Sequence, residues 1–152
     1  MHFHRQTSAA SAYRAVPLAF ALLLGACAST APGASSGSPP DTLVCGLPST
    51  CVSSLTGAPP MRFEGTPAQA IERMRATLAS FPEARIVRAE GLALEAVFTT
   101  PAGFEDRVDF QINPAQQRID YRSRSTLGLY DFGKNRSRMQ LFAERFAATP
   151  NR

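Results

Sequence analysis

The chain has 152 residues, of which 44% are hydrophobic and 18% are charged, with 16 basic and 12 acidic residues. This length is enough for one globular domain with a single core, and it leaves no room for a second. The first 26 residues contain two of the basic residues and no acidic ones, so the remainder carries a net charge of only +2. Such a small positive excess gives no electrostatic basis for binding nucleic acid.

The first 26 residues are typical of a bacterial lipoprotein signal peptide. Arg5 and Arg14 give a positive start, the apolar stretch 15–24 follows, and residues 24–27 read Leu-Gly-Ala-Cys, which matches the lipobox. The apolar stretch is too short to remain in a bilayer as a spanning helix, and it ends at small residues suited to cleavage. We therefore expect the mature chain to begin at Cys27, with palmitate-type lipid on that cysteine. The alternative is an ordinary secretory signal that has Cys27 nearby.

A lipid anchor predicts membrane attachment in the cell envelope. Ala28, rather than an aspartate, follows Cys27, and the usual sorting rule then predicts the inner leaflet of the outer membrane, facing the periplasm. His2 and His4 leave with the signal peptide, so the mature chain contains no histidine. This excludes histidine-ligated metals, Ser-His-Asp triads and Cys-His dyads. We expect no cofactor and no metal.

The segments that follow the lipobox lack the pattern of a packed domain. Residues 27–43 are rich in Ser, Ala, Pro and Gly and predict a flexible tether. Residues 44–60 form a Pro-containing lead-in that includes Cys45 and Cys51, an even pair in an oxidising compartment. We interpret this pair as a structural disulfide. A redox-active pair is the alternative, although its usual spacing is Cys-x-x-Cys.

The folded domain is expected over residues 61–148. A short strand is predicted at 61–64, and a helix begins after Thr66, which forms a Thr-x-x-Gln capping box with Gln69. The helix runs to about residue 81, where Pro82 ends it. Its expected apolar stripe consists of Ala68, Ile71, Met74, Leu78 and Phe81.

Four further strands are predicted at 85–89, 92–100, 107–113 and 118–125. If Asn113 lies opposite Arg118, the last two strands place their apolar residues on one face and their charged residues on the other. A second helix over about 135–147 presents Met139, Phe142, Ala143 and Phe146 to the sheet. The predicted fold class is α+β, a small antiparallel sheet of four to five strands with both helices on one face.

The densest group of polar residues follows the last predicted strand. The chain reads Arg122-Ser123-Arg124-Ser125, then Gly128-Leu129-Tyr130-Asp131-Phe132-Gly133-Lys134-Asn135-Arg136-Ser137-Arg138. This motif, together with Cys-Val-Ser-Ser at 51–54 and the segment 104–110, resembles the DUF1499 family of uncharacterised domains. The resemblance covers roughly residues 51–138. Two positions depart from it, since Thr126 stands where an arginine is expected and Arg107 replaces an aspartate.

The motif allows two interpretations. Several arginines beside the start of a helix are suited to binding a phosphate or carboxylate, and an envelope ligand or envelope protein would then be the partner. In the structural interpretation, Asp109, Asp120 and Asp131 instead pair with Arg122, Arg124 and Arg136 to hold the turn. The candidate residues for either role are Arg122, Ser123, Ser125, Asp131, Gly133, Asn135, Arg136 and Arg138.

The sequence favours a binding or assembly module over an enzyme. A histidine-independent hydrolase would need Ser123 or Ser125 with Lys134, or a carboxylate pair such as Asp106 with Asp109 or Glu90 with Glu95. A periplasmic carrier of lipid or another small hydrophobic ligand is the other alternative. Its cavity would be lined by Phe63, Phe98, Phe104, Phe110, Phe142 and Phe146.

Overall fold

The computed structural model describes residues 43–151, so the predicted signal peptide, Cys27 and the tether up to residue 42 lie outside the described residues. The elements are β1 (Cys51–Ser53), β2 (Met61–Arg62), α1 (Pro67–Ala79), β3 (Ala84–Glu90), β4 (Ala93–Thr99), β5 (Glu105–Asn113), β6 (Arg118–Ser125) and α2 (Lys134–Ala148), with short 3-10 turns η2 (Pro48–Thr50) and η3 (Pro114–Gln116). The fold is α+β, as predicted. No helix within 43–151 has the length and hydropathy needed to span a bilayer.

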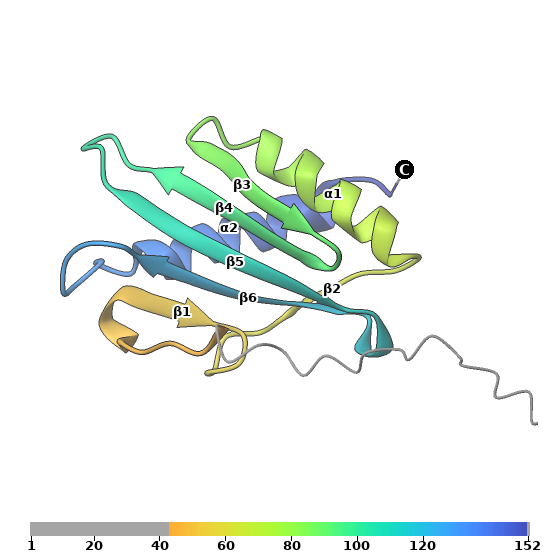
Figure 1. Ribbon diagram of the computed structural model, residues 1–152, viewed down its shortest axis with the longest axis horizontal. Helices are drawn as coiled ribbons and strands as arrows, with labels where there is room; N and C mark the ends of the chain where they lie inside the picture. Colours follow the sequence, from red (N-terminus) through yellow and green to blue (C-terminus); the bar gives the residue numbers. More distant parts are fainter. Residues whose placement is uncertain (1–42, 152) are drawn as a thin grey trace, which may run out of the picture. The chain divides into compact units, whose positions relative to one another are not determined.

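The strands form one antiparallel sheet in the order β1-β6-β5-β4-β3, and β2 also pairs with β6. β1 pairs with residues 122–124 of β6, and β2 pairs with residues 118–119, so the two short strands lie end to end along the same edge of β6. Both helices cover one face of the sheet (Figure 1). The sheet has six strands within the described residues, more than the four to five predicted, and β1 lies in the segment predicted as lead-in.

The predicted hairpin register is confirmed. Asn113 lies opposite Arg118, and Phe110 lies opposite Tyr121 on the face toward the helices. On the other face, Asp109 lies opposite Arg122. Because side chains alternate along a strand, this register decides which motif residues share a face of the sheet.

The start of α1 follows the sequence prediction closely. The Thr66 hydroxyl accepts a hydrogen bond from the Gln69 backbone N–H, and the Gln69 side chain accepts one from the Thr66 backbone N–H. The predicted apolar stripe is wrong at its first position, because Ala68 is exposed and Ala70 is fully buried. A helix that buries Met74 also turns position 70 toward the sheet, since residues four apart share a face.

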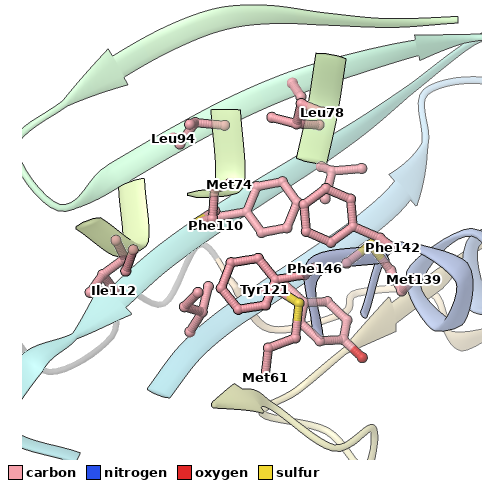
Figure 2. Packing of buried hydrophobic residues seen from close by; sticks show 14 of the residues in the cluster. Met61, Met74, Leu78, Leu94, Phe110, Ile112, Tyr121, Met139, Phe142 and Phe146 are labelled. Carbon is pink, nitrogen blue, oxygen red and sulfur yellow. The ribbon is translucent and has the colours of Figure 1, made fainter. Parts of the chain in front are cut away.

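The core lies between the helices and the sheet (Figure 2). Phe142 of α2 packs against Phe110 and Phe81, with ring centroids 5.0 and 5.9 Å apart, and Phe81 packs edge-on against Phe98. Five of the six phenylalanines proposed as a carrier lining are buried in this core, and Phe104 is exposed. These rings therefore fill the space in which the carrier interpretation places a ligand.

Candidate functional site

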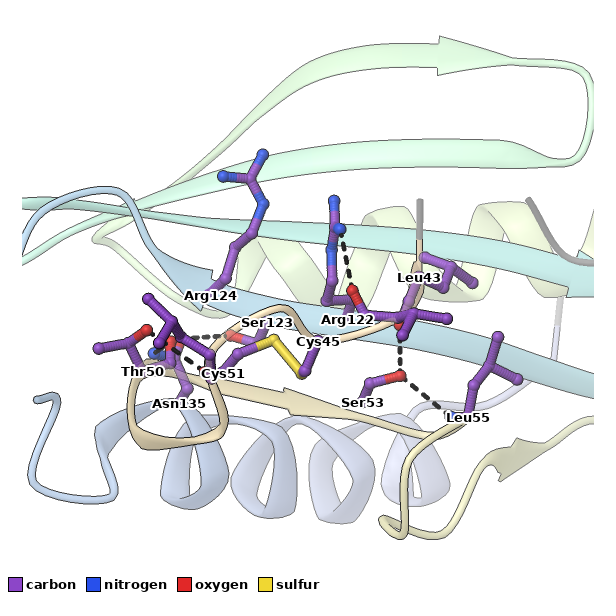
Figure 3. Close-up of a disulfide and its surroundings, with 12 residues drawn as sticks. Leu43, Cys45, Thr50, Cys51, Ser53, Leu55, Arg122, Ser123, Arg124 and Asn135 are labelled. Atoms are coloured by element: carbon purple, nitrogen blue, oxygen red, sulfur yellow. Dashed lines mark hydrogen bonds between the residues drawn. A yellow bond between two sulfur atoms is a disulfide. The ribbon is translucent and has the colours of Figure 1, made fainter. Parts of the chain in front are cut away.

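Alternation along β6 divides the polar motif between the two faces of the sheet. Ser123 points toward α2 and is fully buried, whereas Arg122 and Arg124 lie on the opposite face. Figure 3 shows the two arginines extending from β6 on the side away from α2 and Asn135 on the α2 side. The motif is therefore two sites and not one.

The site on the α2 side is a buried hydrogen-bond network centred on Asn135. Its amide nitrogen donates to the carbonyl oxygen of Thr50 at 3.1 Å and to the hydroxyl of Ser125 at 3.0 Å. Its amide oxygen accepts from the Ser123 hydroxyl at 2.6 Å and from Arg138 at 2.8 Å. Asn135 is completely buried, so the network connects β6, α2 and the end of η2 without contact with water.

Arg138 extends this network and is neutralised within it. Its guanidinium group forms an ion pair with Asp106 of β5, in which both side chains are less than a tenth exposed. The same group lies over the Phe98 ring, 4.9 Å from its centroid. A buried guanidinium group that is paired in this way contributes to the packing of α2 on β5 and has no charge available for a ligand.

Asp131 occupies the place that an anion would take at the start of α2. Its carboxylate accepts hydrogen bonds from the backbone N–H groups of Gly133 and Asn135, at 2.9 and 3.0 Å, and from the Asn135 amide at 2.8 Å. Partial burial raises the pKa of Asp131, but these hydrogen bonds outweigh burial and hold the pKa below its ordinary value. The helix start is already capped by a carboxylate, as the helix dipole favours.

The site on the outer face contains more positive than negative charge. Arg122 donates two hydrogen bonds to Asp109, at 2.7 and 3.1 Å, and a third to the Val44 carbonyl oxygen at 3.3 Å. The Nε atom of Arg124 is 4.0 Å from the same carboxylate oxygen. This Nε atom is buried. Among the buried side-chain nitrogen and oxygen atoms of residues 43–151, it is the one without a hydrogen-bond partner. Arg122 and Arg124 thus share a single carboxylate.

A small pocket of about 220 Å³ adjoins these two arginines. Its other wall is the ring closed by the Cys45–Cys51 disulfide, which the structure contains as predicted. Figure 3 shows this ring lying beside Arg124 and Arg122. The volume is several times the ~30 Å³ that one water molecule occupies, so a phosphate or carboxylate group fits.

Of the remaining sequence-predicted residues, Ser125 also lines this pocket, and the others lie apart from it. Asp120 pairs with Arg118 at 2.9 Å and not with Arg124, and Arg136 is exposed on α2. The structural pairing of Asp109 with Arg122 is the one the sequence predicted. Gly133 is the N-cap residue of α2, in the left-handed region with φ 75°, where a side chain would be strained.

The candidate catalytic groups are either separated by the sheet or held by other side chains. Glu90 and Glu95 both pair with Arg88, at 3.7 and 3.5 Å. Asp106 is buried on the α2 side of β5 and Asp109 lies on the outer face, so the sheet stands between them. Glu95 is bound to Arg107 at 2.7 Å, and Ser123 and Ser125 bond with Asn135. The hydrogen bonds found within residues 43–151 include none between these serines and Lys134.

Arg124 was not predicted as a binding residue, and the disulfide ring was expected outside the site. A signal for Arg124 was present, because strand alternation places it on the same face as Arg122. Arg107 stands directly opposite Arg124 across β5 and β6, and two like charges at opposed positions are unfavourable in a sheet. Glu95 neutralises Arg107 at 2.7 Å, whereas Arg124 is 4.0 Å from Asp109, which Arg122 already binds.

Comparison with known proteins identifies one family. A family model described as "Protein of unknown function (DUF1499)" matches residues 24–146. A comparison with curated proteins finds no match to the chain.

Proposed function

Because the chain belongs to the DUF1499 family, whose description assigns no activity, we propose its function from the site itself: it is a non-catalytic binding module that holds an anionic envelope ligand. The ligand is a phosphate or carboxylate group of an envelope component, and its site is the pocket between β6 and the disulfide ring. The module is attached to the envelope by lipid on Cys27. The observation that carries this proposal is the buried Nε of Arg124, which has no acceptor.

The charges around the pocket support this assignment. Asp109 is the one carboxylate within ion-pair distance of Arg122 and Arg124 among the described residues, and Arg122 already donates two hydrogen bonds to it. Arg124 therefore keeps a positive charge and a free donor beside a pocket. A guanidinium group binds phosphate and carboxylate through its fork of N–H donors.

The other arrangements in the molecule support the proposal by elimination. The helix start, where the sequence analysis considered an anion, holds Asp131. The candidate carboxylates and serines are bound to other side chains or lie on opposite faces, which favours a non-catalytic role. The buried phenylalanines favour a surface site over an internal lipid cavity.

Phosphate titration of the chain, followed by NMR, tests the proposal. Inorganic phosphate added to the mature chain in detergent should shift the resonances of Gly46 and Arg124. Arg124→Ala should weaken binding about tenfold, the loss expected for a charged hydrogen bond. Arg85→Ala is the matched control, because Arg85 is an exposed arginine on β3 that pairs with Glu105 and lies away from the pocket.

Native mass spectrometry gives a second readout of the same proposal. A chain purified from the periplasmic side under mild conditions should carry an added mass that denaturation releases. Arg124→Ala should lose this mass, and Arg85→Ala should keep it. If Arg124→Ala and Arg85→Ala bind phosphate with equal affinity, the pocket is not the binding site.

A further inference from the structure

The loop between β6 and α2 exposes an unusual amount of apolar surface. Its exposed fractions are 70% for Leu127, 81% for Leu129, 64% for Tyr130 and 89% for Phe132. We call these four side chains the apolar loop. Three of them (Leu127, Tyr130 and Phe132) and Phe104 line a groove of about 530 Å³. Clustered apolar side chains of this size are seldom left in water unless something covers them.

The backbone of the apolar loop is held in a strained form. Phe132 has φ 52°, in the left-handed region that bulky side chains rarely adopt, and its ring packs edge-on against Tyr130 with centroids 5.0 Å apart. The disulfide ring braces the loop, since the Ser49 hydroxyl donates to the Leu129 carbonyl oxygen at 2.8 Å and the Asp131 N–H donates to the Ser49 carbonyl oxygen at 3.1 Å. Strain that keeps a phenylalanine in water points to a partner for that ring.

The charges beside the apolar loop indicate what the partner is. The first turn of α2 carries Lys134 and Arg136, both exposed, and it has no acidic residue. Cations at a helix N-terminus oppose the helix dipole, so the stability of α2 does not explain why they are placed here. The one carboxylate of the loop, Asp131, is bonded inward to Gly133 and Asn135. Apolar and aromatic side chains flanked by cations match the interface of an anionic bilayer.

We propose that the apolar loop inserts into the surface of an anionic lipid bilayer. This inference rests on the lipid anchor proposed above, which would bring the domain to the membrane and raise the local concentration of lipid. Residues 28–42 separate Cys27 from the described domain, and a chain of 15 residues can span at most about 50 Å. The loop can therefore meet the same bilayer that holds the anchor.

Tryptophan fluorescence tests this inference, because the chain contains no tryptophan. Tyr130→Trp places one fluorophore in the loop, and Leu92→Trp places one at the β3–β4 turn, at the opposite end of the sheet. Leu92 is also an exposed apolar residue. The full mature chain is reconstituted into vesicles of phosphatidylethanolamine and phosphatidylglycerol with brominated acyl chains. Emission from position 130 should shift to shorter wavelength and be quenched, and emission from position 92 should do neither.

The outcomes separate the loop from the anchor. Flotation of both proteins with the vesicles reports the anchor, and quenching at position 130 alone reports the loop. Adding Leu129→Ser and Phe132→Ser to the Tyr130→Trp protein should abolish quenching and leave flotation intact. Flotation without quenching at position 130 would overturn the inference, as would a wavelength shift that appears only with envelope proteins. If the purified mature chain is quenched at position 130 and its mass shows no lipid on Cys27, the loop is upheld and the anchor is overturned.

Discussion

Asn135 joins three parts of the chain through one amide group. It bonds Ser123 of β6, Arg138 of its own helix and the Thr50 carbonyl oxygen at the end of η2. Full burial makes each of these bonds hard to replace, because no water reaches the groups that would lose a partner. The motif around Asn135 is thus a structural unit, and the proposed binding role belongs to Arg124 on the other face of β6.

Asn135→Ala should lower the free energy of unfolding by about 2–4 kcal/mol, because it leaves the Thr50 carbonyl oxygen without its donor and the Ser123 hydroxyl without its acceptor, and it removes one of the acceptors of Arg138. Urea unfolding followed by circular dichroism measures the change. Gln140→Ala, at an exposed position of the same helix, is the control and should change stability by less than about 0.5 kcal/mol. A similar small loss for Asn135→Ala would mean that the network is not needed for the fold.

Asp131 should make stability depend on pH in acid. Its pKa in the folded chain is lowered by hydrogen bonds from Asn135 and Gly133 that outweigh burial, so the ionised group stabilises the fold above the unfolded-state pKa of about 3.9. That contribution is lost as the pH falls through the lowered folded-state pKa. Asp131→Asn should therefore cost about 0.5–1 kcal/mol at neutral pH and nothing in strong acid.

Unfolding of the wild-type and Asp131→Asn proteins over a range of pH values measures this difference. Glu144→Gln, an exposed substitution on the same helix, is the control and should leave the wild-type acid profile in place. If the free energies of unfolding of the wild type and Asp131→Asn differ by the same amount at all pH values, the charge of the carboxylate does not contribute to stability.

At the scale of elements, the disulfide ring supports both proposed surfaces. It forms one wall of the Arg122–Arg124 pocket and donates to the apolar loop through Ser49. The strand that follows it, β1, pairs with the middle of β6. A disulfide at the start of β1 thus positions two surfaces whose residues are distant in sequence.

Removal of the disulfide should therefore have a global and a local effect. Replacing Cys45 and Cys51 by serine together should lower the free energy of unfolding by about 2–2.5 kcal/mol, the loop-closure estimate for so short a ring. It should also speed hydrogen exchange at the Asp131 N–H, whose acceptor is in the ring. A reductant should reproduce both changes in the wild type and none in the variant. Unchanged exchange at Asp131 would show that the ring does not brace the loop.

The elements differ in how well the sequence predicts them, for physical reasons. α1 carries a capping box and the β5–β6 register follows from alternating side chains, so both were predictable. β1 has only three residues, too few to show alternation, and only its pairing with β6 makes it a strand. The site was predicted as one cluster because its residues are adjacent in sequence, whereas alternation along β6 places Arg122 and Ser123 on opposite faces. The same alternation places Arg124 beside Arg122 on the outer face, but it does not predict the disulfide ring that forms the other wall of the pocket.

At the scale of the whole molecule, both proposed surfaces would bind more strongly if the chain is held at a membrane. A pocket for one phosphate or carboxylate group and a loop of four apolar side chains each give weak binding by themselves. A lipid anchor would make each contact effectively intramolecular and strengthen it without any new contact. Attachment at Cys27 would therefore strengthen binding at both surfaces.

The anchor makes a prediction that does not depend on either surface. Cells that express the chain and receive labelled palmitate should incorporate the label into a form that begins at Cys27. Cys27→Ser should give an unlabelled form that is heavier by residues 1–26, because a lipoprotein signal is removed only after its cysteine carries lipid. Cys45→Ser is the matched control, since it removes another cysteine and should keep both the label and the processed mass. A Cys27→Ser chain cut at the same place would identify an ordinary secretory signal, and the loop and the pocket would then have to bind without a tether. A labelled Cys27→Ser chain would place the lipid on another residue.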